Sequence, residues 1–217
     1  MKKALGILTI LIMMICLSGF KLTKDGSFND TDLYDTEKIY ETEEINACAL
    51  GETKTYMDYR SITNTSSIQY RYIKANMTVD NKTGFLLDDE GFIGVALGSY
   101  FGNIGTRYYI TLDNGVVLPV VKIEEKADRD TDYEGCAQRY DGSVIEFVVD
   151  KDIANSYYGH YANGLVLQGN YSNYYIYDGS IEKIERCLDE KKQDYVTYDL
   201  KDKEPEDYSI FNYASGY

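Results

Sequence analysis

Residues Gly91 to Ile123, with the sequence GFIGVALGSYFGNIGTRYYITLDNGVVLPVVKI, contain three apolar runs separated by Gly, Asn and Asp. Each run has the length and the β-branched and aromatic content that are typical of a strand. Asp113-Asn114-Gly115, between the second and third runs, predicts a tight hairpin because Asn and Gly tolerate positive φ. Pro119 cannot donate to a ladder, so it predicts a sheet edge or a bulge within the third run.

Further strands are predicted downstream of this stretch, in the runs GSVIEFVVD, GLVLQG, NYYIYDG and SIEKIE. Seven short strands with this punctuation favour a barrel or a sandwich. Upstream, Ser66-Ser67 followed by Ile68, Tyr72 and Ile73 predicts a short helix or turn that leads into a strand. We assign residues 47–200 to one β domain, with a last strand at 195–200 and a flexible C-terminal tail at 201–217.

The N-terminal residues have the pattern of an export signal. Lys2 and Lys3 are followed by an uncharged apolar run from Ala4 to Phe20, so residues 1–22 are predicted to be a signal peptide. An uncleaved N-terminal anchor is the alternative, because the run approaches the length that spans a bilayer. Residues 23–46 are rich in acids and lack a sustained period, which predicts a linker. A short docked helix around residues 37–45 is the other interpretation of that segment.

The net charge limits the partners of this chain. The 217 residues include 22 Lys and Arg against 36 Asp and Glu, a formal charge of −14. Such a chain repels phosphate backbones and anionic headgroups, so nucleic acid is excluded and membrane contact is expected only through the N-terminal segment. A secreted or cell-surface monomer is the expected state.

The cysteines outside the export signal are Cys48, Cys136 and Cys187. They are too far apart in sequence for a metal knuckle, and no metal or cofactor is expected. An odd number allows at most one internal disulfide, whose pairing the spacing leaves open. At least one of these thiols is expected to be a small buried hydrophobe.

Glu146 is the strongest candidate for a general acid. Within GSVIEFVVD the period of two places Glu146 between Val144 and Val148 on one face of the strand. A carboxyl among valines loses hydration when it ionises, so its pKa should rise toward the range that suits a general acid. The alternative is a half-exposed face on which Glu146 meets water.

The segment EEKADRDTDYEG, residues 124–135, is the most acidic connection between two predicted strands. Asp128, Asp130 and Asp132 alternate as at the start of a calcium loop, but Tyr133 and Arg139 stand where an EF-hand needs Gly and Glu. An EF-hand is therefore excluded. A looser calcium site and a surface or structural turn both stay open for this segment.

Tyrosine dominates the aromatic residues, with 23 Tyr, 7 Phe and no Trp. Tyr157, Tyr158 and Tyr161 lie in a predicted loop, where their rings could stack on sugar faces while the hydroxyls form hydrogen bonds. Alternatively, these rings close the end of the barrel and bind no ligand.

The order GFIGVALGSYFGNIGTRYYITLDNG, KADRDTD, DGSVIEFVVD resembles the double-psi β-barrel proteins of the 3D-domain, lytic-transglycosylase and expansin-like group. It looks closest to uncharacterised secreted proteins of Gram-positive bacteria and their phages. The resemblance covers about residues 55–185. It implies a mainly β fold, a six- to seven-stranded double-psi-like β-barrel with short helical segments.

The resemblance also implies a set of acids. The group's third aspartate corresponds to Glu146, its second to Asp130 or Asp128, and its first to the position of Leu97. Two functions follow from this partial match. One is a non-catalytic module that binds cell-wall glycan (peptidoglycan) through Tyr157, Tyr158 and Tyr161, which the incomplete acid set favours. The other is a lytic transglycosylase or glycan hydrolase, in which Glu146 protonates the glycosidic oxygen and Asp130 or Asp128 assists in the same groove.

Overall fold

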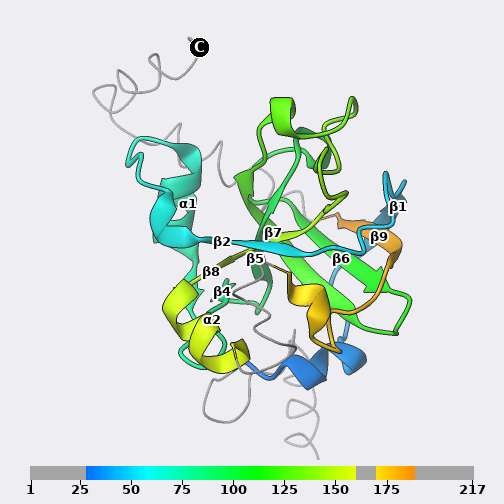
Figure 1. Ribbon diagram of the computed structural model, residues 1–217, viewed down its shortest axis with the longest axis horizontal. Helices are drawn as coiled ribbons and strands as arrows, with labels where there is room; N and C mark the ends of the chain where they lie inside the picture. Colours follow the sequence, from blue (N-terminus) through cyan, green and yellow to red (C-terminus); the bar gives the residue numbers. More distant parts are fainter. Residues whose placement is uncertain (1–27, 160–169, 189–217) are drawn as a thin grey trace, which may run out of the picture.

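The computed structural model describes residues 28–159 and 170–188, which form one mixed sheet with short helices (Figure 1). The strands are β1 Thr42–Ile45, β2 Thr55–Asp58, β3 Thr78–Val79, β4 Leu86–Leu87, β5 Ile93–Leu97, β6 Arg107–Leu112, β7 Val117–Glu125, β8 Glu146–Val149 and β9 Ile181–Cys187. The helices are α1 Ile68–Asn76 and α2 Lys151–Tyr158, with 3-10 turns η1 Asp30–Asp35, η2 Tyr59–Ser61, η3 Ser99–Phe101, η4 Asp128–Asp130 and η5 Tyr171–Asn173. The predicted mainly β class is therefore confirmed.

The sheet has a main path and one branch. The main path runs β1-β9-β6-β7-β5-β4-β3, and β8 joins it by pairing with β5 on one side and β2 on the other. The β5–β7 and β2–β8 pairs are parallel, and the remaining pairs are antiparallel. Among the described residues, the nine strands do not close on themselves. The expected closed barrel of six or seven strands is thus corrected to an open sheet.

The hairpin predicted at Asp113-Asn114-Gly115 is confirmed. Gly115 adopts a φ of +89°, and the Leu112 N–H donates to the Val116 carbonyl at 2.8 Å, closing the turn between β6 and β7. β7 lies between β6 and β5 in the sheet, so it is not an edge strand as a whole, and the predicted sheet edge is present only locally, at Pro119. Pro119 pairs with Tyr109 of β6, whereas the ladder with β5 begins only at Val120. Pro119, which lacks an N–H, therefore lies at a position where β7 pairs only with β6.

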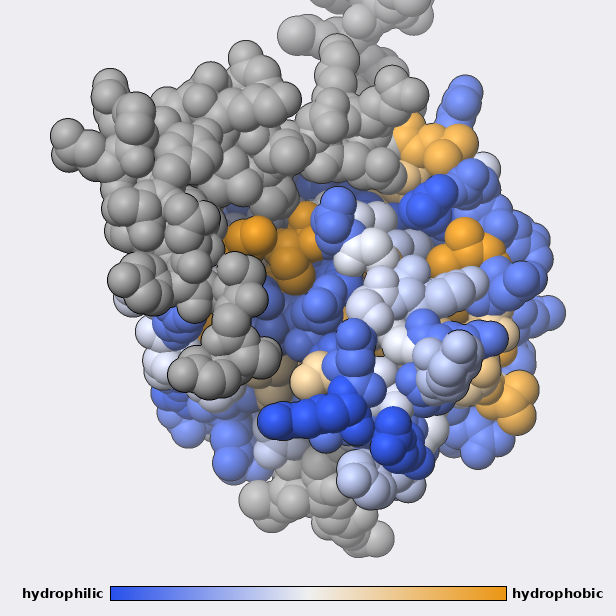
Figure 2. Space-filling model, turned by 90° about the horizontal axis from the view of Figure 1, so that it is seen from above, coloured by the Kyte–Doolittle hydropathy of each residue, from blue (hydrophilic) through white to orange (hydrophobic). Residues whose placement is uncertain are grey.

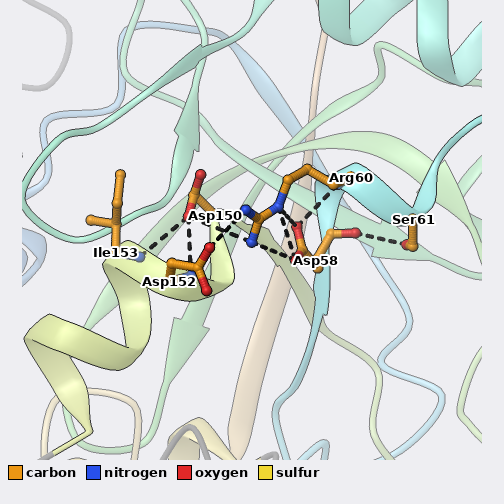
Figure 3. A network of polar contacts seen from close by, with 6 residues as sticks. All are labelled: Asp58, Arg60, Ser61, Asp150, Asp152 and Ile153. Carbon is orange, nitrogen blue, oxygen red and sulfur yellow. Dashed lines mark hydrogen bonds and ion pairs between the residues drawn. The ribbon is translucent and has the colours of Figure 1, made fainter.

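Helix α1 begins where the sequence predicts. The Ser67 hydroxyl accepts a hydrogen bond from the Tyr70 N–H, as an N-cap does, and β3 follows the helix after Met77. Helix α2 begins at an acidic cap that the sequence analysis did not identify. Asp150 accepts from the N–H groups of Asp152 and Ile153, and Arg60, in the turn η2 after β2, reaches the same cluster (Figure 3).

The predicted strand NYYIYDG, residues 173–179, is wrong. Its first residue ends the 3-10 turn η5, and the rest forms turns. The buried rings of Tyr171, Tyr174 and Tyr177 recur every third residue, which is the period of a 3-10 turn rather than of a strand. Tyr174 and Tyr177, which a strand would direct to opposite faces, are therefore both buried in the core.

Both faces of the sheet are covered. Phe147 and Val149 of β8 belong to the larger core, which also contains Tyr158 of α2. Val148, between them, belongs to a second core that α1 covers with Tyr72. Because neighbouring strand residues point to opposite faces, a strand buried on both sides is apolar along its whole length. This explains the nearly continuous apolar runs of β5, β7 and β8.

The segment predicted as an acidic linker, 23–46, is part of the folded domain over its described residues, 28–46. Phe28 and Leu33 are buried in the larger core, and β1 pairs with β9. The few apolar residues among the acids are the ones that anchor it. The alternative docked helix at 37–45 is also replaced, because residues 42–45 form a strand.

A disulfide joins Cys48 to Cys136, while Cys187 is buried on β9 and takes no part in that bond. Over residues 28–159 and 170–188, no helix is long and apolar enough to cross a bilayer. The predicted export signal (1–22), the run GLVLQG (164–169), the last strand (195–200) and the tail (201–217) lie outside the described residues.

Candidate functional site

Two glutamates flank the middle strand of the sheet at one level. Ala96 of β5 pairs with Glu146 of β8 on one side and with Glu124 of β7 on the other. Residues that pair across strands share a face, so both carboxyl side chains leave the sheet on the face of Ala96. Their backbones lie two strand spacings apart, which is roughly 9.5 Å. The small Ala96 side chain leaves the space between them to the two carboxyls.

A β-bulge in β7 places Glu124 on this face. The register against β5 shifts between Val95 and Ala96, so that Lys122 pairs with Val95 and Glu124 pairs with Ala96. Ile123 is the extra residue, and it belongs to the core on the α1 side, as Ala96 does. Without the bulge, Glu124 would pair with Leu97 and point to the opposite face. Bulges commonly re-aim one side chain in this way, and they recur next to functional sites.

The protein environment raises the pKa of both glutamates, and burial is the main cause in each. For Glu146, the charge of Lys126 lowers the pKa and that of Asp141 raises it, without cancelling the effect of burial. For Glu124, hydrogen bonds from the Glu125 N–H and from Gln69 of α1 act against burial, whereas the charges of Glu125 and Glu146 add to it. The pKa rise predicted for Glu146 from its strand period is confirmed.

Lys126 lies close to this site, where it holds two segments of the chain together and its positive charge affects the pKa of Glu146. It is almost completely buried, and its ammonium donates to the Ser143 carbonyl at 3.0 Å and to the Ser143 hydroxyl at 3.2 Å. Burial lowers its pKa, and the charge of Glu146 raises it. Lys126 therefore ties the end of β7 to the residues that lead into β8.

The predicted partner acids lie in the connection between β7 and β8, which extends above the sheet (Figure 1). Asp128 is exposed and accepts a hydrogen bond from the Ser99 hydroxyl at 2.7 Å. Asp130 lies 3.6 Å from the exposed Arg129, between a carboxylate oxygen and Nε. The charges that act on Glu146 are instead those of Lys126 and Asp141. The strand register brings Glu124, rather than Asp128 or Asp130, to the face of Glu146, with Ala96 between them.

Asp132, the third acid of this connection, has a structural role. Its two carboxylate oxygens accept from the N–H groups of Cys136 at 2.8 Å and Ala137 at 3.1 Å. These bonds close a turn, as the structural interpretation of the segment predicted. Within the described part of the chain, no cluster of His, Cys, Asp or Glu has the geometry to hold a metal ion.

Of the tyrosines predicted to bind ligand, Tyr158 lies in the core and Tyr157 packs against it. Tyr158 is 0% exposed at the end of α2, and its hydroxyl lies 3.2 Å from that of Tyr177. Tyr157 is half-buried, with its ring edge-on to Tyr158 at 4.7 Å between centroids. These two residues are helical, so the predicted loop is wrong for them, and Tyr161 lies outside the described residues.

The sequence analysis missed two exposed aromatic rings. Tyr133 and Tyr140 are among the most exposed large apolar residues of the described chain, and both lie between β7 and β8. Tyr140 precedes Asp141, whose charge acts on Glu146. Their position in an acidic, turn-rich segment was the available signal, because rings in such segments are more often exposed than rings in apolar runs.

Comparison of this chain with known proteins gives no relative. A scan against protein-family models finds no match, and comparisons with curated proteins and with solved structures find none either. The resemblance to the double-psi barrel group therefore stays a prediction, and the site must be interpreted from its own geometry.

Proposed function

We propose that the protein acts outside the cell on a cell-wall glycan, peptidoglycan, and cleaves a glycosidic bond with Glu146 as the general acid. The observation that carries the proposal is the pair of partly buried glutamates on either side of Ala96, both with a raised pKa. A raised pKa enlarges the pH range over which a carboxyl carries the proton that it can donate to a leaving oxygen.

In this mechanism, Glu146 donates its proton to the glycosidic oxygen while the bond from that oxygen to the anomeric carbon breaks. A hydroxyl of the same sugar, or a water molecule, forms the new bond to the anomeric carbon, and its proton passes to a carboxylate of the pair. Glu124 supplies the second carboxyl, which stabilises positive charge on the ring or orients the attacking oxygen. Gln69 orients Glu124 through its hydrogen bond.

Three further observations support a polar extracellular ligand. The Cys48–Cys136 disulfide is of a kind that persists in oxidising compartments. On the face seen in Figure 2, the described surface is mostly hydrophilic, with hydrophobic residues in small separate patches. Tyr133 and Tyr140 expose rings of the kind that stack on sugars, in the connection that leads into Glu146.

Binding without cleavage is the second candidate, and the position of Leu97 favours it. The first aspartate of the resembling group corresponds to Leu97, which is 0% exposed in the larger core, on the opposite face from Ala96. A third acid is thus not available from that position. In this case, the carboxyl pair would accept hydrogen bonds from sugar hydroxyls.

The test compares glycan release by the purified oxidised protein with release by Glu146→Gln. We expect the substitution to lower the rate of muropeptide release by about 10²-fold or more, because it removes the proton donor but keeps the shape of the side chain. Asp130→Asn is the matched control, and its rate should stay near that of the wild type.

Two other outcomes would decide against this assignment. Equal release by the wild type and Glu146→Gln, with loss in Asp130→Asn, would move the acid to the connection between β7 and β8. Retention of all three proteins on insoluble peptidoglycan without release by any of them would establish the binding function instead.

A further inference from the structure

A pocket lies at the other end of helix α1 from Gln69. Its volume is about 530 Å³, within the usual range for small-molecule sites. The lining comes from the last two turns of α1, from β3, from the turn between β4 and β5, and from β6. The lining residues are Tyr72, Lys74, Ala75, Asn76, Met77, Thr78, Asp88, Asp89 and Arg107.

Arg107 forms a rigid wall of this pocket. It is 5% exposed, and its Nε donates to Asp88 Oδ2 at 2.9 Å while Nη2 bonds to the same oxygen. Its guanidinium carbon also lies 4.9 Å from the centre of the Phe92 ring and 5.7 Å from that of Tyr40. A guanidinium held on its edge and on its faces cannot turn toward an anionic ligand without losing these contacts.

The charges of the lining cancel. Two cations, Lys74 and Arg107, stand against two carboxylates, Asp88 and Asp89, and Arg107 Nη2 lies 3.8 Å from Asp89. Glu90 contacts Arg107 Nη1 at 3.3 Å and the Tyr40 hydroxyl, outside the lining. A charged ligand would therefore gain little electrostatic attraction from this lining, and it would lose its hydration on binding.

The uncharged lining groups suit hydroxyls and a sugar ring. Asn76 and Thr78 supply an amide and a hydroxyl, Tyr72 supplies an aromatic ring, and Met77 supplies an adaptable apolar side chain. A mostly polar lining with one ring differs from the apolar lining of sites for hydrophobic ligands.

We propose that this pocket binds a neutral saccharide unit. Lys74 and Asp89 provide donors and acceptors for its hydroxyls, and Tyr72 packs against its ring. From Gln69 to Asn76, the rise of α1 spans about 10 Å, so a single oligosaccharide reaches from the pocket toward the glutamate pair. That extension depends on the proposed function, whereas saccharide binding in the pocket does not.

The test is an NMR titration of the full chain with N,N′-diacetylchitobiose, which is neutral, and with glucosamine and glucuronate, which carry one charge each. We expect saturable shifts of the Asn76, Thr78 and Arg107 amides with the neutral sugar, and binding about tenfold weaker or less with the charged ones. Equal or tighter binding of either charged sugar would overturn the charge argument. If none of the three sugars causes saturable shifts, the proposed saccharide site is wrong.

Thr78→Trp and Ala75→Trp place a large side chain from an exposed lining residue into the pocket, and each should weaken binding about tenfold or more. Asn155→Trp, on an exposed position of α2, is the matched control and should bind as the wild type does. This titration measures binding without turnover, which separates failure of the pocket from failure of the catalytic proposal. Wild-type affinity in both blocking variants, with folded spectra, would contradict the proposal.

Discussion

At the scale of the residue, opposing effects determine the pKa of the Glu146 carboxyl. Burial raises its pKa, the ammonium of Lys126 lowers it, and the carboxylate of Asp141 raises it. Ala96, which pairs with both Glu146 and Glu124, places only a methyl group between them. The acid strength of this site is therefore adjustable by single substitutions that leave the two glutamates in place.

Lys126→Met and Asp141→Asn are expected to move the Glu146 pKa in opposite directions. Loss of the ammonium should raise the pKa further, and loss of the exposed carboxylate should lower it. A general acid works while protonated, so glycan release should fall as pH rises through the pKa. This falling limb should move to higher pH in Lys126→Met and to lower pH in Asp141→Asn. Carboxyl-detected NMR titration measures the pKa directly.

The same shift has a consequence for stability. Because the folded pKa of Glu146 lies above the unfolded one, the folded protein binds more protons between the two values, and this contribution to stability falls as pH rises. Glu146→Gln should remove that slope. Movement of the pKa in the same direction in both Lys126→Met and Asp141→Asn would contradict the assigned environment.

At the scale of the element, helix α2 depends on its first turn. Asp150 accepts from the Asp152 N–H at 3.0 Å and the Ile153 N–H at 3.2 Å, which satisfies two donors that the helix cannot pair itself. Arg60 joins this cap to β2, with its Nη1 2.7 Å from Asp152 and its Nη2 2.7 Å from Asp58 (Figure 3). The cap holds the helix that carries Tyr158 into the core.

Asp150→Ala should lower the free energy of unfolding by about 1 kcal/mol, because it removes both capping bonds. Asp150→Asn is the matched control, since Asn caps helices as well as Asp does. Arg60→Ala should cost less than Asp150→Ala, because its ion pairs are exposed to water. Urea unfolding of the three variants measures the differences. Equal losses in Asp150→Asn and Asp150→Ala would show that the charge matters rather than the cap.

At the scale of the whole molecule, the connection between β7 and β8 is attached to distant parts of the chain. The Cys48–Cys136 disulfide spans 88 residues and links this connection to the segment after β1. Gly98 meets the same connection so closely that a Cβ there would lie 1.9 Å from the Gly135 carbonyl oxygen. Only glycine allows this approach of two backbones. The chain that leads into Glu146 is thus held from two sides.

Replacement of both Cys48 and Cys136 by Ala should lower the free energy of unfolding by about 2–4 kcal/mol, because the unfolded chain loses the constraint of a long closed loop. Cys187→Ala is the control that keeps the disulfide. Thiol titration of the unfolded wild type should find one thiol, that of Cys187, outside the export signal. A wild-type midpoint of urea unfolding in the double variant would contradict a stabilising role for the bond.

The local features of this protein were determined by the sequence alone. The hairpin at Asn114-Gly115, the cap of α1 at Ser67 and the strands around Val95, Val120 and Phe147 depend on neighbouring residues, whose propensities are visible in the sequence. The direction of the Glu146 pKa shift was predictable from the apolar run around it, but β8 begins at Glu146, so only Val148 of the two predicted valine neighbours lies on the same strand.

Only the tertiary structure decided which distant residues meet. The position of Glu124 opposite Ala96 depends on a bulge in the β5–β7 register, and the burial of Tyr158 depends on how α2 packs on the sheet. Likewise, only the tertiary structure shows that the nine described strands form an open path from β1 to β3, with β8 branching toward β2. Register and packing are sums over contacts between residues far apart in sequence, so no local pattern specifies them.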